Sequence, residues 1–510
     1  MLRQRLVDTA IVVGTIAISA AQLIAAGIQL DVKKHVLANG MRILVLENHS
    51  APVFSSVVRF NVGAVDERPG ITGSSHLLEH MRFKGSRIIG TTDYAAEAPI
   101  LAQIDSVAHL MKAEQVRLQS PLNPQDSTRY KQLRQQIADL QALEKQYIVK
   151  DEIWRIYLQN GAMGFNASTG NDGTQYIVSL PSNRLELWAF MESDRLSNLV
   201  LREFYSERDV VMEERRMSLE NSPRGVLREA ASATTNWATP YTWPVVGWMS
   251  DLQSVQREDV EQYYKEHYSV SNAVAVIVGD VSADQVFTLC EKYFGGIPAQ
   301  PLPDPVVTRD APQRGERRVD VEFDASPMAT VLWHVPQIGH SDLPALDVAS
   351  SILSQGRTSR FFKNIRQTRI GQASAGVEAF SRYPGTFSVD IQPFGDHPVK
   401  EVEDSVYAEI ERMKTTKVSN WEIEKVINQG DAALVRTLDN NMGLAYRLAN
   451  SETLTGNWRY FVDYQDALKK VTADDIMRVC NTYLTRENRT VVSLVKPYAQ
   501  QAAQTPGKAN

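Results

Sequence analysis

Cysteine is almost absent from this chain of 510 residues, which contains only Cys290 and Cys480. Two cysteines nearly two hundred residues apart cannot form the disulfide framework of a small secreted domain. Neither has the neighbours of a metal or nucleophile site, and the lack of cysteine near the start excludes a lipid-anchored lipoprotein. The fold must therefore be stabilised by its hydrophobic cores.

An excess of positive charge is also missing. The chain has 54 Lys and Arg against 60 Asp and Glu, a net charge of −6, and no basic stripe. Nucleic-acid binding depends on neutralising phosphates, so it is excluded as a function class. Hydrophobic residues at 43% and charged residues at 22% are typical of a globular protein. The length exceeds what one core supports, so at least two domains are expected.

Long hydrophobic runs are missing except at the start of the chain. Residues 10–26 are apolar and rich in small side chains, and two arginines precede them. This pattern predicts an export signal over residues 1–30 and a periplasmic protein. Asp8 interrupts the pattern, so the alternative is an uncleaved anchor in the inner membrane over residues 6–28. Contact with a membrane is expected only through this segment.

Three chemically active residues, His76, Glu79 and His80, stand together in the stretch HLLEH. On a helix that begins near Ser74 or Ser75, positions i, i+3 and i+4 share one face, so these side chains converge. Two imidazoles can hold a zinc ion while a neighbouring carboxylate takes the proton of an attacking water. A single histidine is usually an ordinary core or surface residue, but this combination is far more specific.

A third metal ligand is expected on the helix that contains FYSERDVVMEERRMSLEN. One face of this helix would carry Glu207, Val210, Val211 and Glu214. Glu214 is the candidate ligand, and Glu207, two turns earlier, is positioned to support a histidine ring. The alternative is a solvated helix face with pairs of charges at i,i+4, and the spacing alone does not decide between the two for Glu214.

The chain also repeats itself. The pattern that leads to Asn272 and the strand AVAVIVG returns before Asn488 and RTVVSLV, at an offset of 488 − 272 = 216. Pro52 and Pro327 precede similar strands at an offset of 327 − 52 = 275. The difference, 275 − 216 = 59, indicates that the first half carries about 59 residues that the second lacks. Residues 95–158, with helical spacing on both sides of a proline cluster, account for this length.

These observations predict an α+β fold of two homologous, α/β-sandwich-like halves, the first with a long helical-hairpin insertion at about 95–158. The residues that stand 275 positions after His76 and His80 are Ser351 and Gln355, neither of which is a usual metal ligand. Only the first half is therefore expected to hold a metal. The Pro-rich linker cannot continue a helix or a central strand. The expected parts are a catalytic half at 31–297, the linker at 298–316, a non-catalytic half at 317–497 and a disordered tail at 498–510.

HLLEH and the later motifs FNASTGNDGTQY, SERDVVMEE, TPYTWPVVGWMSDL and HYSVSNAVAVIVGDV resemble the pitrilysin/insulinase family of inverzincin metallopeptidases, in its two-domain, processing-peptidase-like form. The resemblance extends from residue 31 to about 497. It implies one zinc per chain, held by His76, His80 and a distal Glu, with Glu79 as general base. His80 and Glu214 are 134 residues apart, and removing 59 leaves 75, which suits the family. The implied activity is a zinc metalloendopeptidase that hydrolyses peptides or unfolded polypeptides.

The resemblance also implies where a substrate peptide binds. An extended peptide would add to the sheet edge formed by Asn166, Ala167, Ser168 and Thr169. Family members that cleave alone usually supply an Arg and a Tyr, seven residues apart, from the second half. The matching residues are Arg366 and Ala373, so the tyrosine is missing.

The missing tyrosine has two interpretations. The chain would be the catalytic subunit of a heterodimer whose paralogous partner carries the Arg/Tyr pair, or it would be a homodimer of reduced activity. The alternative function, from a different class, is a non-catalytic peptide-binding or structural subunit of a processing-peptidase-like assembly. The retained His76, Glu79, His80 and Glu214 argue against this alternative, because a purely structural subunit has no physical reason to keep them.

Overall fold

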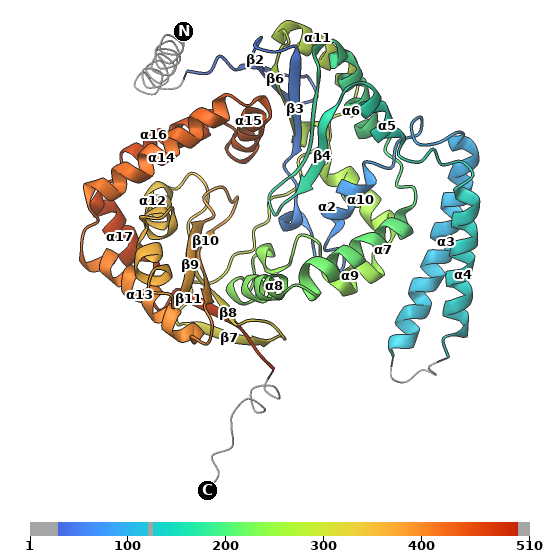
Figure 1. The fold of residues 1–510 in the computed structure, drawn as a ribbon. Helices are drawn as coiled ribbons and strands as arrows, with labels where there is room; N and C mark the ends of the chain where they lie inside the picture. The colour runs from blue at the N-terminus through green and yellow to red at the C-terminus, as the bar shows by residue number, and fades with distance from the viewer. Residues whose placement is uncertain (1–28, 121–125, 498–510) are drawn as a thin grey trace, which may run out of the picture.

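The computed structural model describes residues 29–120 and 126–497, so the expected tail and all but the last two residues of the expected export signal lie outside the described residues. The described chain forms an α+β fold with two mixed β-sheets, one in each half (Figure 1). No helix in this part of the chain is both long and apolar enough to span a bilayer. The predicted fold class is confirmed.

The first sheet has six strands in the order β1-β2-β6-β3-β5-β4. β2 and β6 run parallel, and the other neighbouring pairs run antiparallel. All seven residues of β6 are buried, as its unbroken apolar sequence AVAVIVG predicts for a strand covered on both faces. The strands are β1 (Lys33–Val36), β2 (Arg42–Glu47), β3 (Val53–Phe60), β4 (Met163–Thr169), β5 (Thr174–Pro181) and β6 (Ala273–Gly279).

The second sheet has five strands in the order β7-β11-β8-β10-β9 and repeats this pattern, with β7 and β11 as its parallel pair. Its strands begin at the distances that the sequence repeat predicts: 317 − 42 and 328 − 53 both give 275, and 489 − 273 gives 216. The strands are β7 (Arg317–Glu322), β8 (Met328–Val335), β9 (Gly371–Val377), β10 (Gly385–Pro393) and β11 (Arg489–Val495).

Helices accompany the sheet in each half, and residues 298–316 between the halves contain neither helix nor strand. The first half contains α2 (Ser74–Met81), α3 (Tyr94–Gln119), α4 (Thr128–Glu144), α5 (Glu152–Gln159), α6 (Leu185–Ser197), α7 (Phe204–Arg215), α8 (Pro223–Thr235), α9 (Met249–Ser254), α10 (Arg257–His267) and α11 (Ala283–Phe294). The second contains α12 (Leu343–Ser354), α13 (Val399–Thr415), α14 (Asn420–Leu438), α15 (Asn441–Thr455), α16 (Tyr460–Lys469) and α17 (Ala473–Tyr483).

The helical hairpin of α3 and α4 extends away from the rest of the molecule (Figure 1). Ile104 and Ala108 of α3 and Leu133 and Ile137 of α4 are buried in the hydrophobic core of the first half. The predicted proline turn lies at the residues between the two helices that the structure does not describe. In the second half, the chain between α12 and β9 contains only one short π-helix, so the hairpin is the extra length of the first half.

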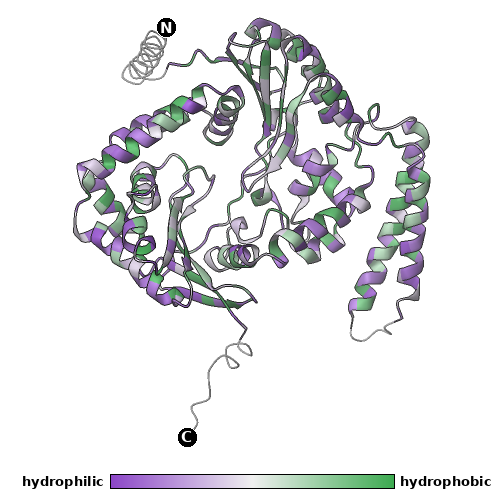
Figure 2. Cartoon of the chain, in the orientation of Figure 1, coloured by the Kyte–Doolittle hydropathy of each residue, from purple (hydrophilic) through white to green (hydrophobic). Residues whose placement is uncertain are grey.

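The two halves exchange one helix each. α8 of the first half lies on the second sheet, where Leu227 and Ala231 pack against β11. α15 of the second half lies on the first sheet, where Leu448 and neighbouring apolar residues pack against β3 and β6. Figure 2 shows hydrophobic residues gathered in the strands of the first sheet and alternating with hydrophilic residues along the helices. This exchange explains why β6 is buried on both faces and fixes the halves against each other.

Candidate metal centre

Helix α2 carries His76, Glu79 and His80 and begins at Ser74, as predicted. The helix is capped by Gly73, which has a φ of +90°, and no serine side chain caps it. Instead, the carboxylate of Glu67 accepts hydrogen bonds from the backbone N–H groups of Gly73 and Ser75, both at 2.7 Å. Because a carboxylate from the preceding loop satisfies these N–H groups, the helix needs no serine cap.

Helix α7 lies beside α2 and presents Glu207 and Glu214 to it. Val211, between them in sequence, is fully buried and anchors the helix to the first core. Val210, which is 52% exposed, and Glu214 lie where this face opens to solvent. Glu207, Val211 and Glu214 follow an i, i+4, i+7 pattern.

His76, His80 and Glu214 come together in a group whose possible ligand atoms all lie within 4.8 Å of one another. Among the described residues this is the one group of three or more His, Cys, Asp or Glu side chains with such geometry. The carboxylate of Glu214 is 3.8 Å from His76 Nε2 and 3.6 Å from His80 Nε2. Tetrahedral zinc places its ligand atoms about 3.3 Å apart and accepts this donor set, so the three residues fit zinc after small side-chain movements.

The ring of His80 is held by a second carboxylate. Its Nδ1 lies 3.0 Å from Glu207 Oε1, and Lys84 Nζ lies 2.6 Å from Glu207 Oε2. Burial favours the neutral acid, but the bonds from His80 and Lys84 outweigh it and hold the pKa of Glu207 at about 2. An ionised Glu207 accepts the proton of Nδ1, which leaves Nε2 of His80 free to face a metal.

The pKa values of the two imidazoles shift in opposite directions. Burial, reinforced by the charge of His80, lowers the pKa of His76 to about 4, so His76 is neutral as a ligand must be. Burial also favours a neutral His80, but the bond to Glu207 and the charges of Glu207 and Glu214 outweigh it and raise its pKa.

Glu79 lies beside the metal-binding group and is held by strand β4. Thr169 Oγ1 donates a 2.6 Å hydrogen bond to Glu79 Oε2. Burial raises the pKa of Glu79, and the charge of Glu214 adds to this, while the bond from Thr169 opposes it. A carboxylate with a raised pKa is suited to accept a proton near neutral pH. The sequence contained no signal for this contact, because the two residues are 90 positions apart.

The strand expected to bind substrate, β4, lies at the edge of the first sheet and pairs only with β5 among the described strands. Its register is irregular between Met163 and Asn166. Ala167, Ser168 and Thr169 line a cavity of about 430 Å³ together with His76, Glu79 and Glu214. Asn166 is exposed but is not among the residues that line this cavity.

The two second-half residues predicted from the resemblance lie elsewhere. Arg366 ends the π-helix Phe362–Arg366 and lines a larger cavity of about 650 Å³, not the one with His76. Ala373 lies in β9 and packs against the core of the second half. The structure therefore does not bring Arg366 or Ala373 together with the metal-binding group.

A network between the halves was not foreseen from the sequence. Tyr241 lines both cavities and donates to the carboxylate oxygens of Asp172, both at 2.8 Å. Arg382, from the loop between β9 and β10, forms an ion pair with Asp66 at 2.8 Å and also contacts Asp172. This network joins the second half to the loops beside α2. Its bonded members are between 69 and 316 residues apart, so no local pattern indicated it.

Comparison with protein families gives two matches on separate parts of the chain. Residues 42–100 match the family described as insulinase, peptidase family M16, and this segment includes HLLEH. Residues 254–429 match the family described as the peptidase M16 inactive domain. The two matches follow the asymmetry between the halves, because the second segment contains Ser351 and Gln355 in place of His76 and His80.

Individual relatives extend the similarity to most of the chain. Zinc protease PqqE of Helicobacter pylori is 25% identical over 472 residues, which cover 90% of this chain and 91% of the relative. Mitochondrial-processing peptidase subunit beta of Saccharomyces cerevisiae is 22% identical over 354 residues, which cover 66% of this chain and 76% of the relative.

Solved structures show the same fold. The crystal structure of a protease from Helicobacter pylori matches with a TM-score of 0.75 at 23% identity, covering 92% of this chain and all of that one. The periplasmic protease PqqL from Escherichia coli matches with a TM-score of 0.68 at 14% identity, covering 94% of this chain and 49% of that one.

Proposed function

Because the chain belongs to the M16 family of insulinase/pitrilysin peptidases, we propose that it is a zinc-dependent endopeptidase that hydrolyses peptides or unfolded polypeptides. The observation that carries this proposal is the convergence of His76, His80 and Glu214 next to Glu79. These three ligands would hold one zinc ion per chain. A zinc ion held in this way supplies Lewis acidity to the site.

Glu79 would act as the general base. Its carboxylate takes a proton from the attacking water and later gives it to the leaving amine, so no covalent intermediate is required. The hydroxyl of Thr169 holds Glu79 Oε2 in place, and one oxygen of Glu79 remains for the proton transfer. Glu207 and Lys84 keep His80 in the tautomer and orientation that a ligand needs.

The edge of β4 would bind the substrate. An extended peptide that pairs with this edge forms main-chain hydrogen bonds, which require no particular side chain. Ala167, Ser168 and Thr169 line the same cavity as Glu79, so a peptide bond on this edge lies near the base. Asn166 would extend the pairing edge, and Arg366 would contact the substrate from the second half. A folded protein lacks free extended segments, which favours unfolded substrates.

The decisive experiment is substitution of the base. Glu79→Gln is expected to keep one zinc per chain and to lose peptide hydrolysis by a factor of about 10²–10⁴, the usual contribution of general base catalysis. Metal analysis and cleavage of a fluorescent peptide measure the two quantities. Undiminished hydrolysis by this variant contradicts the mechanism.

A second candidate is a non-catalytic peptide-binding or structural subunit of a larger assembly. The observation that favours it is Ala373, which stands at the usual tyrosine position and packs into the second core. The related proposal is a heterodimer in which this chain supplies the zinc and a paralogue supplies the Arg/Tyr pair. Peptide hydrolysis by the isolated chain, with and without the co-expressed paralogue, distinguishes them: no hydrolysis in either case supports the structural subunit.

The location of the protein stays a prediction. We propose export to the periplasm, with an uncleaved anchor as the alternative, from the apolar segment of residues 10–26. A distant structural neighbour is described as periplasmic, which supports the proposal. Fractionation of cells and N-terminal sequencing of the mature protein test it, and recovery of the uncleaved chain from the cytoplasm contradicts it.

A further inference from the structure

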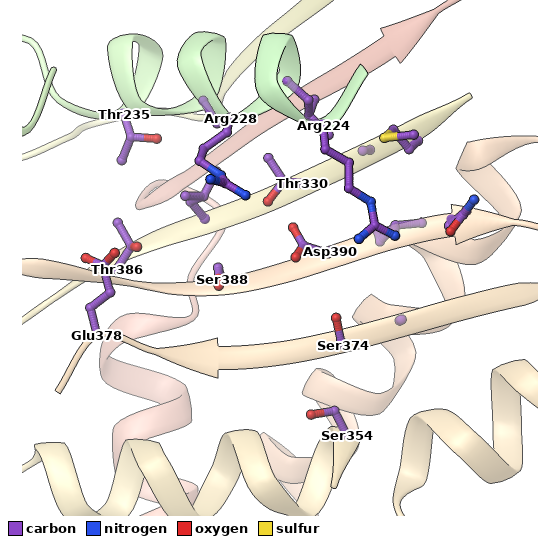
Figure 3. Close-up of a pocket in the computed structure, with 18 of the residues that line it drawn as sticks. Arg224, Arg228, Thr235, Thr330, Ser354, Ser374, Glu378, Thr386, Ser388 and Asp390 are labelled. Atoms are coloured by element: carbon purple, nitrogen blue, oxygen red, sulfur yellow. The ribbon is translucent and has the colours of Figure 1, made fainter. Parts of the chain in front are cut away.

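The larger cavity, of about 650 Å³, lies between α8 of the first half and the second sheet. Figure 3 shows α8 along one side, with strands of the second sheet on the other. This cavity and the one with Glu79 share four lining residues, which are Asn171, Arg228, Ser232 and Tyr241. A peptide bound at β4 therefore has a direct path from the metal centre into the larger cavity.

Two arginines of α8, Arg224 and Arg228, line this cavity. They are one helical turn apart and so share a face, and Figure 3 shows both side chains extending from α8 toward the strands opposite. Leu227 and Ala231 pack against β11 and fix the rotation of the helix. Within residues 29–120 and 126–497, neither arginine forms a hydrogen bond or an ion pair. Arg215, at the end of α7, in contrast forms an ion pair with Glu229 of α8 at 2.7 Å.

The acidic residues near Arg228 are already engaged. In the smaller cavity, which Arg228 also lines, Glu229 is bonded to Arg215, Glu79 accepts from Thr169, and Glu214 faces the two imidazoles. None of these carboxylates is bonded to Arg228. The guanidinium of Arg228 is therefore available to a ligand at the junction of the two cavities.

The wall opposite α8 is mostly uncharged. Its polar side chains are largely hydroxyls, and the acidic ones are Asp390, which lies opposite Arg224 in Figure 3, and Glu378. Burial, together with the charge of Asp172, raises the pKa of Glu378. The hydroxyl-bearing residues of the second half at this cavity are Thr330, Ser354, Ser359, Ser374, Thr386 and Ser388. Arg366 adds a third positive charge at this cavity.

We propose that Arg228, supported by Arg224, forms a subsite that binds a carboxylate of the substrate, so that the enzyme prefers acidic peptides. A guanidinium binds a carboxylate through two parallel N–H···O bonds, which give geometric selectivity as well as attraction. The hydroxyls opposite can donate further hydrogen bonds to the same group. The proposal rests on the proposed peptidase function and adds the substrate class to it.

The test compares peptides that differ only by Glu or Gln at successive positions on both sides of the cleaved bond. At one or two positions the Glu peptide is expected to have a kcat/KM about tenfold higher, because one charge-assisted bidentate contact in a partly solvated site is of this order. Arg228→Gln is expected to bring this ratio close to one, and Arg228→Glu to reverse the preference in favour of Lys peptides. Arg228→Lys keeps the positive charge but loses the two parallel bonds. This variant is expected to keep part of the preference for the Glu peptide.

The matched control is Arg216→Gln. Arg216 lies in the π-helix Arg216–Glu220, is bonded to Glu213 and does not line either cavity. This variant removes the same charge from the same region and is expected to keep the Glu/Gln ratio. If Arg216→Gln lowers the Glu/Gln ratio of kcat/KM as much as Arg228→Gln does, the effect is a general electrostatic one and the subsite is overturned.

A second pair of peptides identifies the source of the carboxylate. If the subsite binds a Glu or Asp side chain, amidation of the peptide C-terminus leaves kcat/KM unchanged. If it binds the terminal carboxylate, amidation lowers kcat/KM about tenfold, and Arg228→Gln removes that difference. Either result supports the subsite, whereas no dependence on any carboxylate overturns it.

Failure of the subsite is distinguishable from failure of the proposed function. A zinc-loaded wild-type chain that cleaves no peptide contradicts the proposed function. A chain that cleaves peptides with a Glu/Gln ratio near one, and whose kcat/KM is unchanged by amidation of the peptide C-terminus, overturns only the subsite. If Arg228 variants do not fold, the comparison of their kcat/KM values is replaced by a binding measurement. Fluorescence anisotropy then gives the dissociation constants of labelled Glu and Gln peptides for the Glu79→Gln variant. Equal dissociation constants at low salt for the Glu, Gln and C-terminally amidated peptides then overturn the proposal.

Discussion

Helices α2 and α7 of the first half and α12 and α14 of the second half occupy equivalent places in two copies of one fold, yet they carry different chemistry. The offset of 275 residues pairs His76 and His80 with Ser351 and Gln355. The offset of 216 residues pairs Glu214 with Gly430, because 214 + 216 = 430. Glu207 corresponds to position 207 + 216, which is Ile423, a buried member of the second core.

This difference teaches that the scaffold does not depend on the metal centre. The second half forms the same strand order and the same helix pair with apolar packing where the first half has a charged network. Four side chains thus distinguish the half with the candidate metal centre from the other half. The stability of each half comes from its own core and from the exchanged helices.

The largest effect is expected from removing a ligand that only the first half has. Glu214→Gln should reduce zinc from one per chain to nearly none and lower peptide hydrolysis by about 10³-fold or more, since the metal supplies several kcal/mol of transition-state stabilisation. The control is Glu424→Gln on α14, an exposed residue of the second half, which should change neither quantity. Full zinc occupancy in Glu214→Gln contradicts the assignment.

The exchanged helices allow a comparison of stability between the halves. Leu448 of α15 is fully buried in a large cluster with β3 and β6, whereas Leu227 of α8 belongs to a small cluster on β11. Leu448→Ala should therefore cost about 4 kcal/mol of unfolding free energy and Leu227→Ala about 2 kcal/mol, because a better-enclosed site leaves a larger cavity. Urea unfolding measures both, and the reverse order refutes this view of the exchange.

A smaller effect is expected from Glu207, whose counterpart in the second half is apolar. Glu207→Gln should weaken zinc binding by about 10–100-fold, the usual effect of a residue that orients a ligand. Competition with a zinc chelator measures the affinity. Glu213→Gln is the matched control, because Glu213 lies on the same helix but pairs with Arg216 on the surface. Equal affinities in the two variants contradict a role for Glu207.

The smallest effect is expected from the contact between β4 and Glu79. Thr169→Val keeps the shape of the side chain but removes the hydrogen bond to Glu79 Oε2, and kcat should fall about tenfold with zinc content unchanged. Thr169→Ser keeps the hydroxyl and should restore most of the activity. Steady-state kinetics measure both variants, and identical kcat values for Val and Ser exclude this role of the hydroxyl.

Local patterns in the sequence predicted much of the fold. The repeat offsets of 275 and 216 place the starts of β7, β8 and β11 at their observed residues, because homologous halves keep the spacing inside each packed unit. The start of α2 at Ser74 was also predicted, but the group that satisfies its first backbone N–H groups was not. The carboxylate of Glu67, from the preceding loop, accepts from the N–H groups of Gly73 and Ser75.

The sequence by itself determined two α+β halves and the presence of ligand-type residues in only one of them, since periodicity and spacing are properties of short segments. The tertiary structure alone decided that Thr169 holds Glu79, that α8 and α15 cover each other's sheets, and that Arg228 lies between two cavities. These contacts join residues from 90 to several hundred positions apart. They depend on how the halves pack, which no local pattern records.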